Sequence, residues 1–157
     1  MLRITKQTDY GIVLLTHMAA TPERWATAPE LALGASLPAP MVAKILKILA
    51  REGLLTSHRG AAGGYALARP AGEISVAQII TALEGPIAVT ECTDSEPGLC
   101  HQEDSCPVRG NWNRINLAIR EALEGISLAE MTAPVRRGPE LVTLTRRRDL
   151  APLVTAP

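Results

Sequence analysis

The three cysteines of this 157-residue chain all lie in one short window, as Cys92, Cys100 and Cys106. Thiolates are soft ligands that suit iron–sulfur clusters and zinc, and the polar, glycine-containing loop between these residues is able to wrap around one centre. An odd number of cysteines confined to one loop does not resemble a disulfide framework. The spacing therefore predicts a metal or redox centre, with three unliganded surface thiols as the simpler alternative.

An iron–sulfur cluster is the first expectation for this centre, and zinc is the second. The cysteines lack the paired C-x-x-C spacing of a zinc ribbon. A zinc site of three cysteines and one histidine would need His101, but this residue directly follows Cys100, and adjacent residues rarely ligate the same ion. The sequence does not distinguish a 2Fe-2S cluster from a 4Fe-4S cluster.

A long helix is predicted directly after the cysteine loop, from Pro107 to about Glu124. Cys106 is then expected at its N-cap, where backbone amides and the helix dipole favour a thiolate. Metal binding would thereby be coupled to the way this helix begins. The apolar residues of the helix recur in steps of four and three, the spacing of a helix–helix seam, which predicts a homodimer. They are Val108, Trp112, Ile115, Ile119 and Ala122.

The residues before the cysteine loop predict a mainly helical domain with one hairpin. Capping boxes beginning at Thr27 and Ser75 mark two helix starts, and Thr8 is expected to cap the first helix, which is mostly core and includes Val13. The glycine-rich segment Arg59–Gly64 is typical of a hairpin tip. The predicted elements are helices from Thr8 to about Ala20, Thr27 to about Gly34, Pro38 to Arg51 and Ser75 to Gly85, strands Leu54–His58 and Tyr65–Ala68, and a brief segment Ile126–Met131.

Lys44, Lys47 and Arg51 share the outer face of the predicted helix Pro38–Arg51. Such a cationic stripe is usually an ordinary solvated face. Here it follows a helix and a tight turn and precedes the hairpin, which is the order of elements in a winged helix-turn-helix, a fold that places its second helix in the major groove. We therefore expect double-stranded DNA as the partner. The inner face of the helix carries Val42, Ile45, Leu46 and Leu49.

The hairpin tip is the second expected DNA contact. Arg59 can reach phosphates or the minor groove, and the glycines that follow, beginning with Gly60, permit backbone conformations that bring the tip close to DNA. Overall charge neither favours nor excludes nucleic acid, since sixteen basic residues balance sixteen acidic ones.

Four segments are expected: a winged helix-turn-helix domain over 1–85, a cluster-binding loop over 86–106, a dimerisation helix with a short following helix over 107–132, and a mobile tail over 133–157. No segment has the length and apolarity of a membrane span or a secretory signal, so we expect a cytoplasmic protein with no membrane partner. The sequence holds no Ser-His-Asp set, phosphate-binding loop or dinucleotide fingerprint, so no enzyme activity is expected.

Together these stretches resemble the iron–sulfur-sensing winged-helix regulators of the IscR and NsrR type, with the regulators of SUF iron–sulfur assembly operons as the nearest subgroup. The resemblance spans about residues 1–130. It rests on Leu2–Lys6 and Thr8–Tyr10, the wing Arg59–Tyr65, the stretches Ile74–Val76 and Ala82–Gly85, and the three-cysteine loop.

The resemblance implies a homodimer that binds a palindromic operator, with one cluster per subunit on the three cysteines and Arg59 as a wing contact. The sequence departs from the IscR pattern in a longer first cysteine spacing and in Arg109, which stands at the position of a histidine ligand. Regulators of the NsrR type use an acidic residue on the partner subunit's first helix, which implies Asp9 as the fourth ligand. Asp9 is equally well interpreted as a first-turn acid favoured by the helix dipole. The substitutes are Glu91, Asp94, His101 and Glu103.

The implied function is a transcriptional regulator, a repressor or an activator, that senses iron–sulfur cluster status and controls SUF-type assembly genes. A nitric oxide or redox sensor of the same fold is one alternative. A zinc-stabilised winged-helix module that binds a protein partner is another, and an electron-transfer protein is a third.

Overall fold

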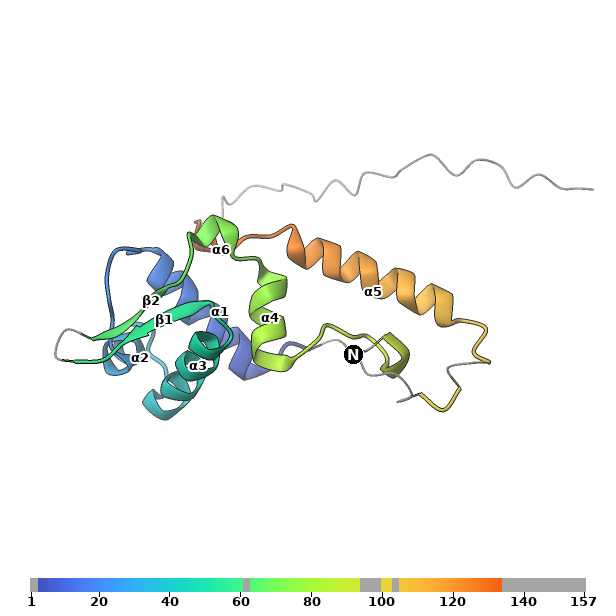
Figure 1. The fold of residues 1–157 in the computed structure, drawn as a ribbon, viewed down its shortest axis with the longest axis horizontal. Coiled ribbons are helices and arrows are strands. Elements are labelled where there is room, and N and C mark those ends of the chain that lie inside the picture. Colours follow the sequence, from blue (N-terminus) through green and yellow to red (C-terminus); the bar gives the residue numbers. More distant parts are fainter. Residues whose placement is uncertain (1–2, 61–62, 94–99, 103–104, 134–157) are drawn as a thin grey trace, which may run out of the picture.

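The computed structural model describes residues 3–60, 63–93, 100–102 and 105–133. These residues are mainly helical, with one two-stranded antiparallel sheet (Figure 1). Residues 134–157, nearly the whole of the tail expected to be mobile, lie outside the described residues. The elements are helices α1 (Lys6–Ala19), α2 (Ala28–Gly34), α3 (Ala39–Arg51), α4 (Val76–Glu84), α5 (Arg109–Glu124) and α6 (Leu128–Thr132), strands β1 (Leu55–His58) and β2 (Gly64–Leu67), and short 3-10 turns η1 (Ala71–Glu73) and η2 (Glu91–Thr93).

The core lies where α1, α3, α4 and α6 meet. All four apolar positions predicted for α3 are fully buried, so the amphipathic pattern of this helix is confirmed. Burial of such branched side chains is the main favourable contribution to folding, at about 1.5–3 kcal/mol each. The largest fully buried side chains are Leu14, Leu15, Ile45, Leu46, Leu49, Ile74, Ile79, Leu128 and Val42.

Helix α6 packs with this core although it follows the long helix α5 in sequence. Leu128 is fully buried, and its N–H donates to the Ile74 carbonyl at 2.7 Å. A capping box of Ser127 and Glu130, not predicted from the sequence, fixes where the helix begins. The predicted boxes at the starts of α2 and α4 are both confirmed. The chain therefore leaves the core after α4 and returns to it along α5 (Figure 1).

Helix α1 begins earlier than predicted, at Lys6. Thr5 is its N-cap, because the Thr5 hydroxyl accepts a hydrogen bond from the Thr8 N–H at 3.3 Å. Thr8 lies inside the first turn and is fully buried, so the prediction that it caps the helix is wrong. Val13 is 39% exposed and was wrongly expected in the core, because the buried face of α1 runs through Leu14, Leu15 and Met18.

Helix α5 also differs at its start. It begins at Arg109, and Val108 is the N-cap residue. A turn precedes the helix, with a hydrogen bond from the Arg109 N–H to the Cys106 carbonyl at 3.3 Å. The prediction that Cys106 is the N-cap is therefore wrong.

The two predicted strands of the hairpin are confirmed, and a third segment is bridged to them. Leu55 pairs with Leu67 and His58 with Gly64, and an isolated bridge joins Ala26 to Tyr65 on the far side of β2. Gly64 has a φ of 155°, and a Cβ at this position would lie 2.7 Å from the Ala26 carbonyl oxygen. Glycine is therefore required for the segment before α2 to pair with β2.

No single helix in the described ranges is long and apolar enough to cross a membrane. Helices α2 and α3 together have enough length and apolar composition for such a span, but the pair is bent by 119° at its break.

Candidate nucleic-acid interface and cysteine region

Helices α2 and α3 form a helix-turn-helix. They are bent by 119° relative to one another across residues 35–38, and such pairs typically meet at about 90–120° across a short turn. Ser36 has a φ of 54°, a left-handed backbone conformation that lets the chain reverse. The Leu37 N–H then donates to the Ala32 carbonyl at 2.9 Å and closes the turn. The turn sets the direction in which α3 projects.

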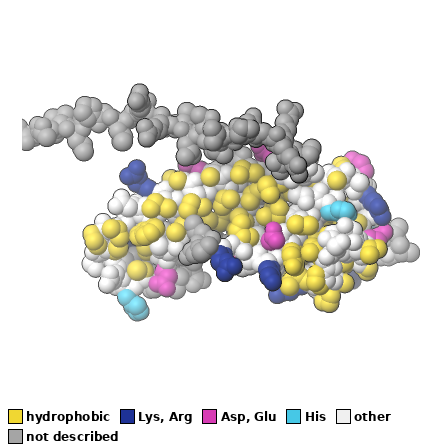
Figure 2. All heavy atoms as spheres, turned by 180° about the vertical axis from the view of Figure 1, so that it is seen from behind, with side chains coloured by type: hydrophobic (Ala, Val, Ile, Leu, Met, Phe, Trp, Pro, Cys, Tyr) yellow, Lys and Arg dark blue, Asp and Glu magenta, His cyan; other side chains and the backbone are white. Residues whose placement is uncertain are grey.

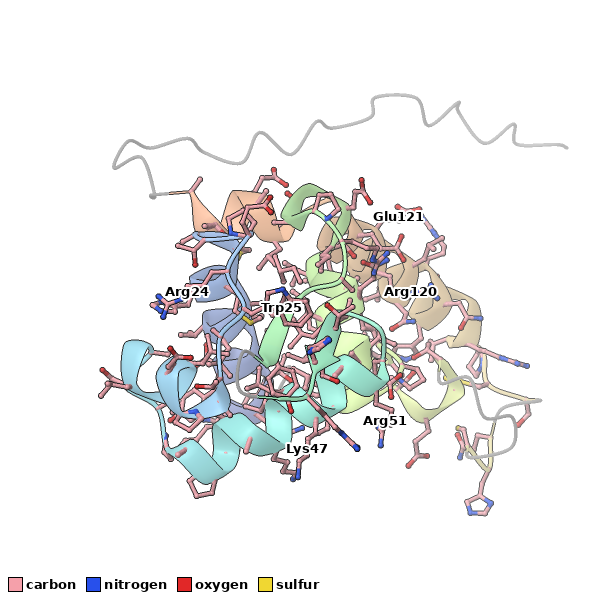
Figure 3. All side chains as sticks on the ribbon, turned by 60° about the vertical axis from the view of Figure 1, so that its left-hand side comes forward. Arg24, Trp25, Lys47, Arg51, Arg120 and Glu121 are labelled. Atoms are coloured by element: carbon pink, nitrogen blue, oxygen red, sulfur yellow. The ribbon has the colours of Figure 1, made fainter. Side chains whose placement is uncertain are left out.

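The outer face of α3 carries the three predicted basic residues. Lys44 and Lys47 are exposed, and within the described part of the chain neither makes a hydrogen bond or an ion pair. Arg51 is also exposed, but its Nε lies 2.9 Å from Oε1 of Glu52. Lys47 and Arg51 point away from the body of the molecule (Figure 3). The two lysines are therefore the better placed of the three to meet phosphate.

The predicted wing contacts lie at the far end of β1. Arg59 and Gly60 are both exposed. Gly60 has a φ of 119°, a conformation that side chains with a Cβ rarely adopt, and the Gly63 N–H donates to its carbonyl at 2.9 Å. The two residues between them, 61 and 62, lie outside the described residues. The wing thus projects a basic side chain beside a tight turn.

An aromatic pair at the base of the wing has no counterpart among the sequence-based predictions. The ring of Trp25 (Figure 3) meets that of His58 edge to face, with centroids 5.9 Å apart and planes at 72°. Trp25 is 42% exposed. It immediately precedes Ala26, whose bridge to β2 places the indole against β1. No periodic pattern signals such a contact, because a single bridging residue creates it.

The three cysteines are free and each is half-buried. Cys92 lies in η2, where its Sγ is 3.2 Å from the Thr90 hydroxyl. Among the described residues no three His, Cys, Asp or Glu side chains come together in a way that could hold a metal ion. The described residues therefore do not bring the three cysteines together within one chain, and Asp94 and Glu103 lie outside the described residues. Their chemistry still suits a cluster, because three free thiols lie in one segment.

Asp9, the predicted fourth ligand, is exposed in the first turn of α1. This turn is held against the end of α4, because Oε1 of Glu84 accepts from the Thr5 N–H at 3.0 Å and from the Thr5 hydroxyl at 2.9 Å. Partial burial raises the pKa of Glu84, but hydrogen bonds from Thr8 and Thr5 outweigh it and lower the pKa below its ordinary value. Asp9 is therefore presented to solvent from a fixed position.

Helix α5 packs against α4 and η2, and its one buried residue is Asn116. Its Oδ1 accepts from the Val89 N–H at 3.1 Å. The hydroxyl of Thr93 accepts from the same N–H and from the Thr90 N–H, both at 3.1 Å. Cys92 thus lies in a hydrogen-bonded turn that is attached directly to α5.

Elsewhere α5 is loosely held. A cavity of about 720 Å³ lies beside α4 and is also lined by Arg120 and Glu124 of α5. Apolar side chains of the helix and its N-cap remain exposed, among them Val108 at 45%, Ile115 at 43% and Leu117 at 54%. From behind, hydrophobic side chains form a band along this end of the molecule (Figure 2). A 16-residue helix that buries so little is suited to packing against another surface.

Comparison with known proteins identifies the family. The family model described as "Rrf2: Iron-dependent Transcriptional regulator" matches residues 4–134. The chain belongs to the Rrf2 family. It is accordingly a transcriptional regulator of a DNA-binding family, and its helices and two-stranded sheet agree with the winged-helix fold of Rrf2 proteins.

Relatives and solved structures agree with this assignment. Protein aau3 of Rhizobium meliloti is 32% identical over 130 residues, which cover 83% of this chain and 84% of that protein. CymR, the global cysteine regulator of B. subtilis, superposes with a TM-score of 0.66 at 28% identity over 84% of this chain and 97% of that one. IscR of T. potens gives a TM-score of 0.62 at 28% identity, over 83% and 85% of the two chains. These two solved structures are therefore named as two different regulators, CymR and IscR.

Proposed function

We propose that this Rrf2 protein is a homodimeric operator-binding regulator whose DNA affinity is set by an iron–sulfur cluster on Cys92, Cys100 and Cys106, and that it controls SUF-type iron–sulfur assembly genes. The observation that carries the proposal is the attachment of the Cys92 turn to α5 through Asn116. This contact connects the cysteine region to a helix whose Ile115 and Leu117 side chains are exposed.

The DNA-binding surface consists of the outer face of α3 and the wing. Lys44, Lys47 and Arg51 face outward from α3, and Arg59 with Gly60 stands at the hairpin tip. In this docking α3 enters the major groove and the wing contacts the adjacent backbone or minor groove. Neutralising phosphates with these cations supplies affinity, while contacts to base edges supply specificity.

The dimer forms through the exposed apolar stripe of α5. Val108 and Ile115 are 45% and 43% exposed in the single chain, although such residues are usually buried. Pairing two α5 helices would cover both stripes and place two α3 helices in a fixed relation. Half-sites of an operator lie about 34 Å apart, or multiples of this, so the relation between the two α5 helices decides whether both α3 helices fit.

The three thiols would hold the cluster, and Asp9 from a second copy of the chain would supply the fourth ligand. When bound, the cluster supplies a redox-active centre that iron scarcity or oxidants remove. The protein's own residues would transmit the presence of the cluster to α5. Thr90, Thr93 and Asn116 hold the turn around Cys92 against α5, so that ordering this turn also orders α5 relative to α4.

Anaerobic purification tests the proposal. We expect iron and acid-labile sulfide in the protein, visible absorption from sulfur-to-iron charge transfer, and an operator affinity that changes by about 5- to 150-fold on cluster removal, the usual range of allosteric coupling. Bound zinc without visible absorption would instead favour a zinc-stabilised module. Equal affinity of loaded and stripped protein would refute the sensing role.

A further inference from the structure

The N-terminal end of α3 is apolar. Its first turn is Ala39-Pro40-Met41, preceded by Pro38 as the N-cap residue. Ala39 and Pro40 are exposed, and Ala43 is partly exposed. The first side chain beyond them with a hydrogen-bonding group on the outer face is Lys44. Residues near the N-terminus of the second helix are the ones that reach base edges in a helix-turn-helix.

The backbone at this end of α3 also offers few donors. Proline has no N–H, so Pro40 contributes none, and Pro38 makes no side-chain cap. The Val42 N–H already donates to the Pro38 carbonyl at 3.0 Å. Of the amides that normally stay open at a helix start, those of Ala39 and Met41 are left. Neither side chains nor backbone at this tip are equipped for bidentate hydrogen bonding to a base.

The outer face of α3 is apolar at its N-terminal end and charged further along the helix. Pro40, Lys44, Lys47 and Arg51 follow one another at intervals of four, three and four residues, so they lie on one face. Ala43 flanks this row next to Pro40, one turn further along than Ala39. The first turn can therefore enter the groove while the lysines stay near its rim, within reach of phosphate.

We propose that α3 reads its operator through thymine methyl groups, with Pro40 and Ala43 as the side chains that contact them. The C5-methyl of thymine is the one apolar group on the major-groove edge of the base pairs, and small apolar side chains recognise it by contact. The proposal rests on the DNA binding proposed above and specifies its chemistry. Each operator half-site then contains thymines whose methyl groups, not their hydrogen-bonding atoms, determine affinity.

The experiment begins with selection of the operator from random duplexes by the full-length protein. Each thymine of the selected half-site is then replaced by deoxyuridine, which keeps the base pair and removes the methyl group. We expect a decrease of about fourfold in affinity at each contacted position, the effect of one buried carbon, and no decrease elsewhere in the site. Failure to select any sequence would refute the proposed DNA binding itself.

Two variants assign the contact to α3. In Ala43→Gly and Pro40→Ala proteins, the deoxyuridine penalty should shrink at one position each, because the methyl group no longer has its partner. Ala50→Gly is the matched control, since Ala50 is also a partly exposed α3 alanine but lies at the opposite end of the helix. Circular dichroism checks that all three variants stay folded. Selective binding that is insensitive to deoxyuridine at every position, or a penalty that is unchanged in both variants, would overturn the proposal.

Discussion

The side-chain oxygen of Asn116 accepts a hydrogen bond from the backbone N–H of Val89 at 3.1 Å, across 27 positions of sequence. Asn116 is 7% exposed and is the one buried residue of α5. A buried amide side chain is stable only when it is hydrogen-bonded. The turn that carries Cys92 is therefore attached to α5 by a buried hydrogen bond.

Asn116→Ala should loosen the Cys92 turn without unfolding the protein. Val89 keeps its second acceptor, the Thr93 hydroxyl at 3.1 Å, so the free energy of unfolding should fall by only about 1 kcal/mol. The rate of thiol labelling at Cys92 in the cluster-free protein, followed by mass spectrometry, should rise. Operator affinity should also depend less on the cluster, because the hydrogen bond that joins the turn to the helix is absent.

Asn113→Ala is the control for this variant, because Asn113 is an exposed asparagine on the same helix. It should leave both the labelling rate and the cluster dependence unchanged. If Asn116→Ala labels at the wild-type rate, Asn116 does not hold the Cys92 turn, whatever happens to stability.

Lys47→Ala should weaken DNA binding more than Arg51→Ala. Lys47 makes no ion pair within the described residues, whereas Arg51 has Glu52 at 2.9 Å, and this carboxylate reduces its attraction for phosphate. Removing one lysine–phosphate pair should lower the slope of log K against log salt by about 0.9 in magnitude. Titrations at several salt concentrations give both quantities. A larger effect at Arg51 would mean that the Glu52 pair breaks on binding.

Arg59→Ala should reduce affinity through the wing. If Arg59 contacts phosphate, the decrease is similar for all sequences and the salt slope changes by about 1. If it contacts a base, the decrease is about 1–3 kcal/mol and selectivity at one position relaxes. Arg120→Ala serves as the control, because Arg120 lies on α5 and pairs with Glu124 at 3.6 Å. Wild-type affinity and slope in Arg59→Ala would remove the wing arginine from the interface.

The sequence predicted those features that depend on local spacing. The capping boxes at Thr27 and Ser75 and the buried face of α3 follow from residues within one or two turns of each other. The box at Ser127 has the same local spacing, so it too was within reach of sequence reasoning. The Asn116 contact has no local signal, because its partner is a backbone amide in another segment. The Trp25 and His58 pair also has no local signal, because it depends on the bridge between Ala26 and Tyr65, which are far apart in the sequence.

The cysteine region was predictable only in its chemistry. Residue type and clustering predict that the thiols are ligands, but a ligand set depends on how segments distant in sequence come together. The N-cap was wrongly predicted at Cys106 for a similar reason. A single turn between Cys106 and Arg109 decides which residue begins α5, and the sequence spacing did not indicate this turn.

Ile115→Asp should prevent dimerisation while leaving the single chain folded. Ile115 is 43% exposed, so an acidic side chain here has little cost in the monomer but places two like charges in the proposed seam. Sedimentation velocity should show a monomer, and operator binding should weaken because two half-sites are no longer engaged together. Leu33→Asp is the control, since Leu33 is 84% exposed on α2. A dimeric Ile115→Asp protein would exclude this face of α5 as the interface.

Stability should fall on acidification through three glutamates. Backbone and side-chain hydrogen bonds from Thr27 and Ser127 lower the pKa values of Glu30 and Glu130 below the ordinary 4.5. In Glu84, burial raises the pKa, and the hydrogen bonds from Thr8 and Thr5 lower it by more. A carboxyl group whose pKa is lower in the folded state binds protons more readily when unfolded. Its contribution to stability is therefore complete above about pH 4.5 and disappears as the pH falls through the folded value.

The Glu84→Gln variant isolates one of these contributions. Glutamine can still accept from Thr5 but does not titrate, so the midpoint of thermal unfolding should depend less steeply on pH below about 5 than in the wild type. Glu121→Gln is the matched control, because the Glu121 side chain makes no hydrogen bond or ion pair within the described part of the chain. Because Glu84 holds the first turn of α1 through these hydrogen bonds, its protonation should also weaken the attachment of the segment that presents Asp9. Parallel pH curves for wild type and Glu84→Gln would show that this carboxylate is not a stabilising anion of the fold.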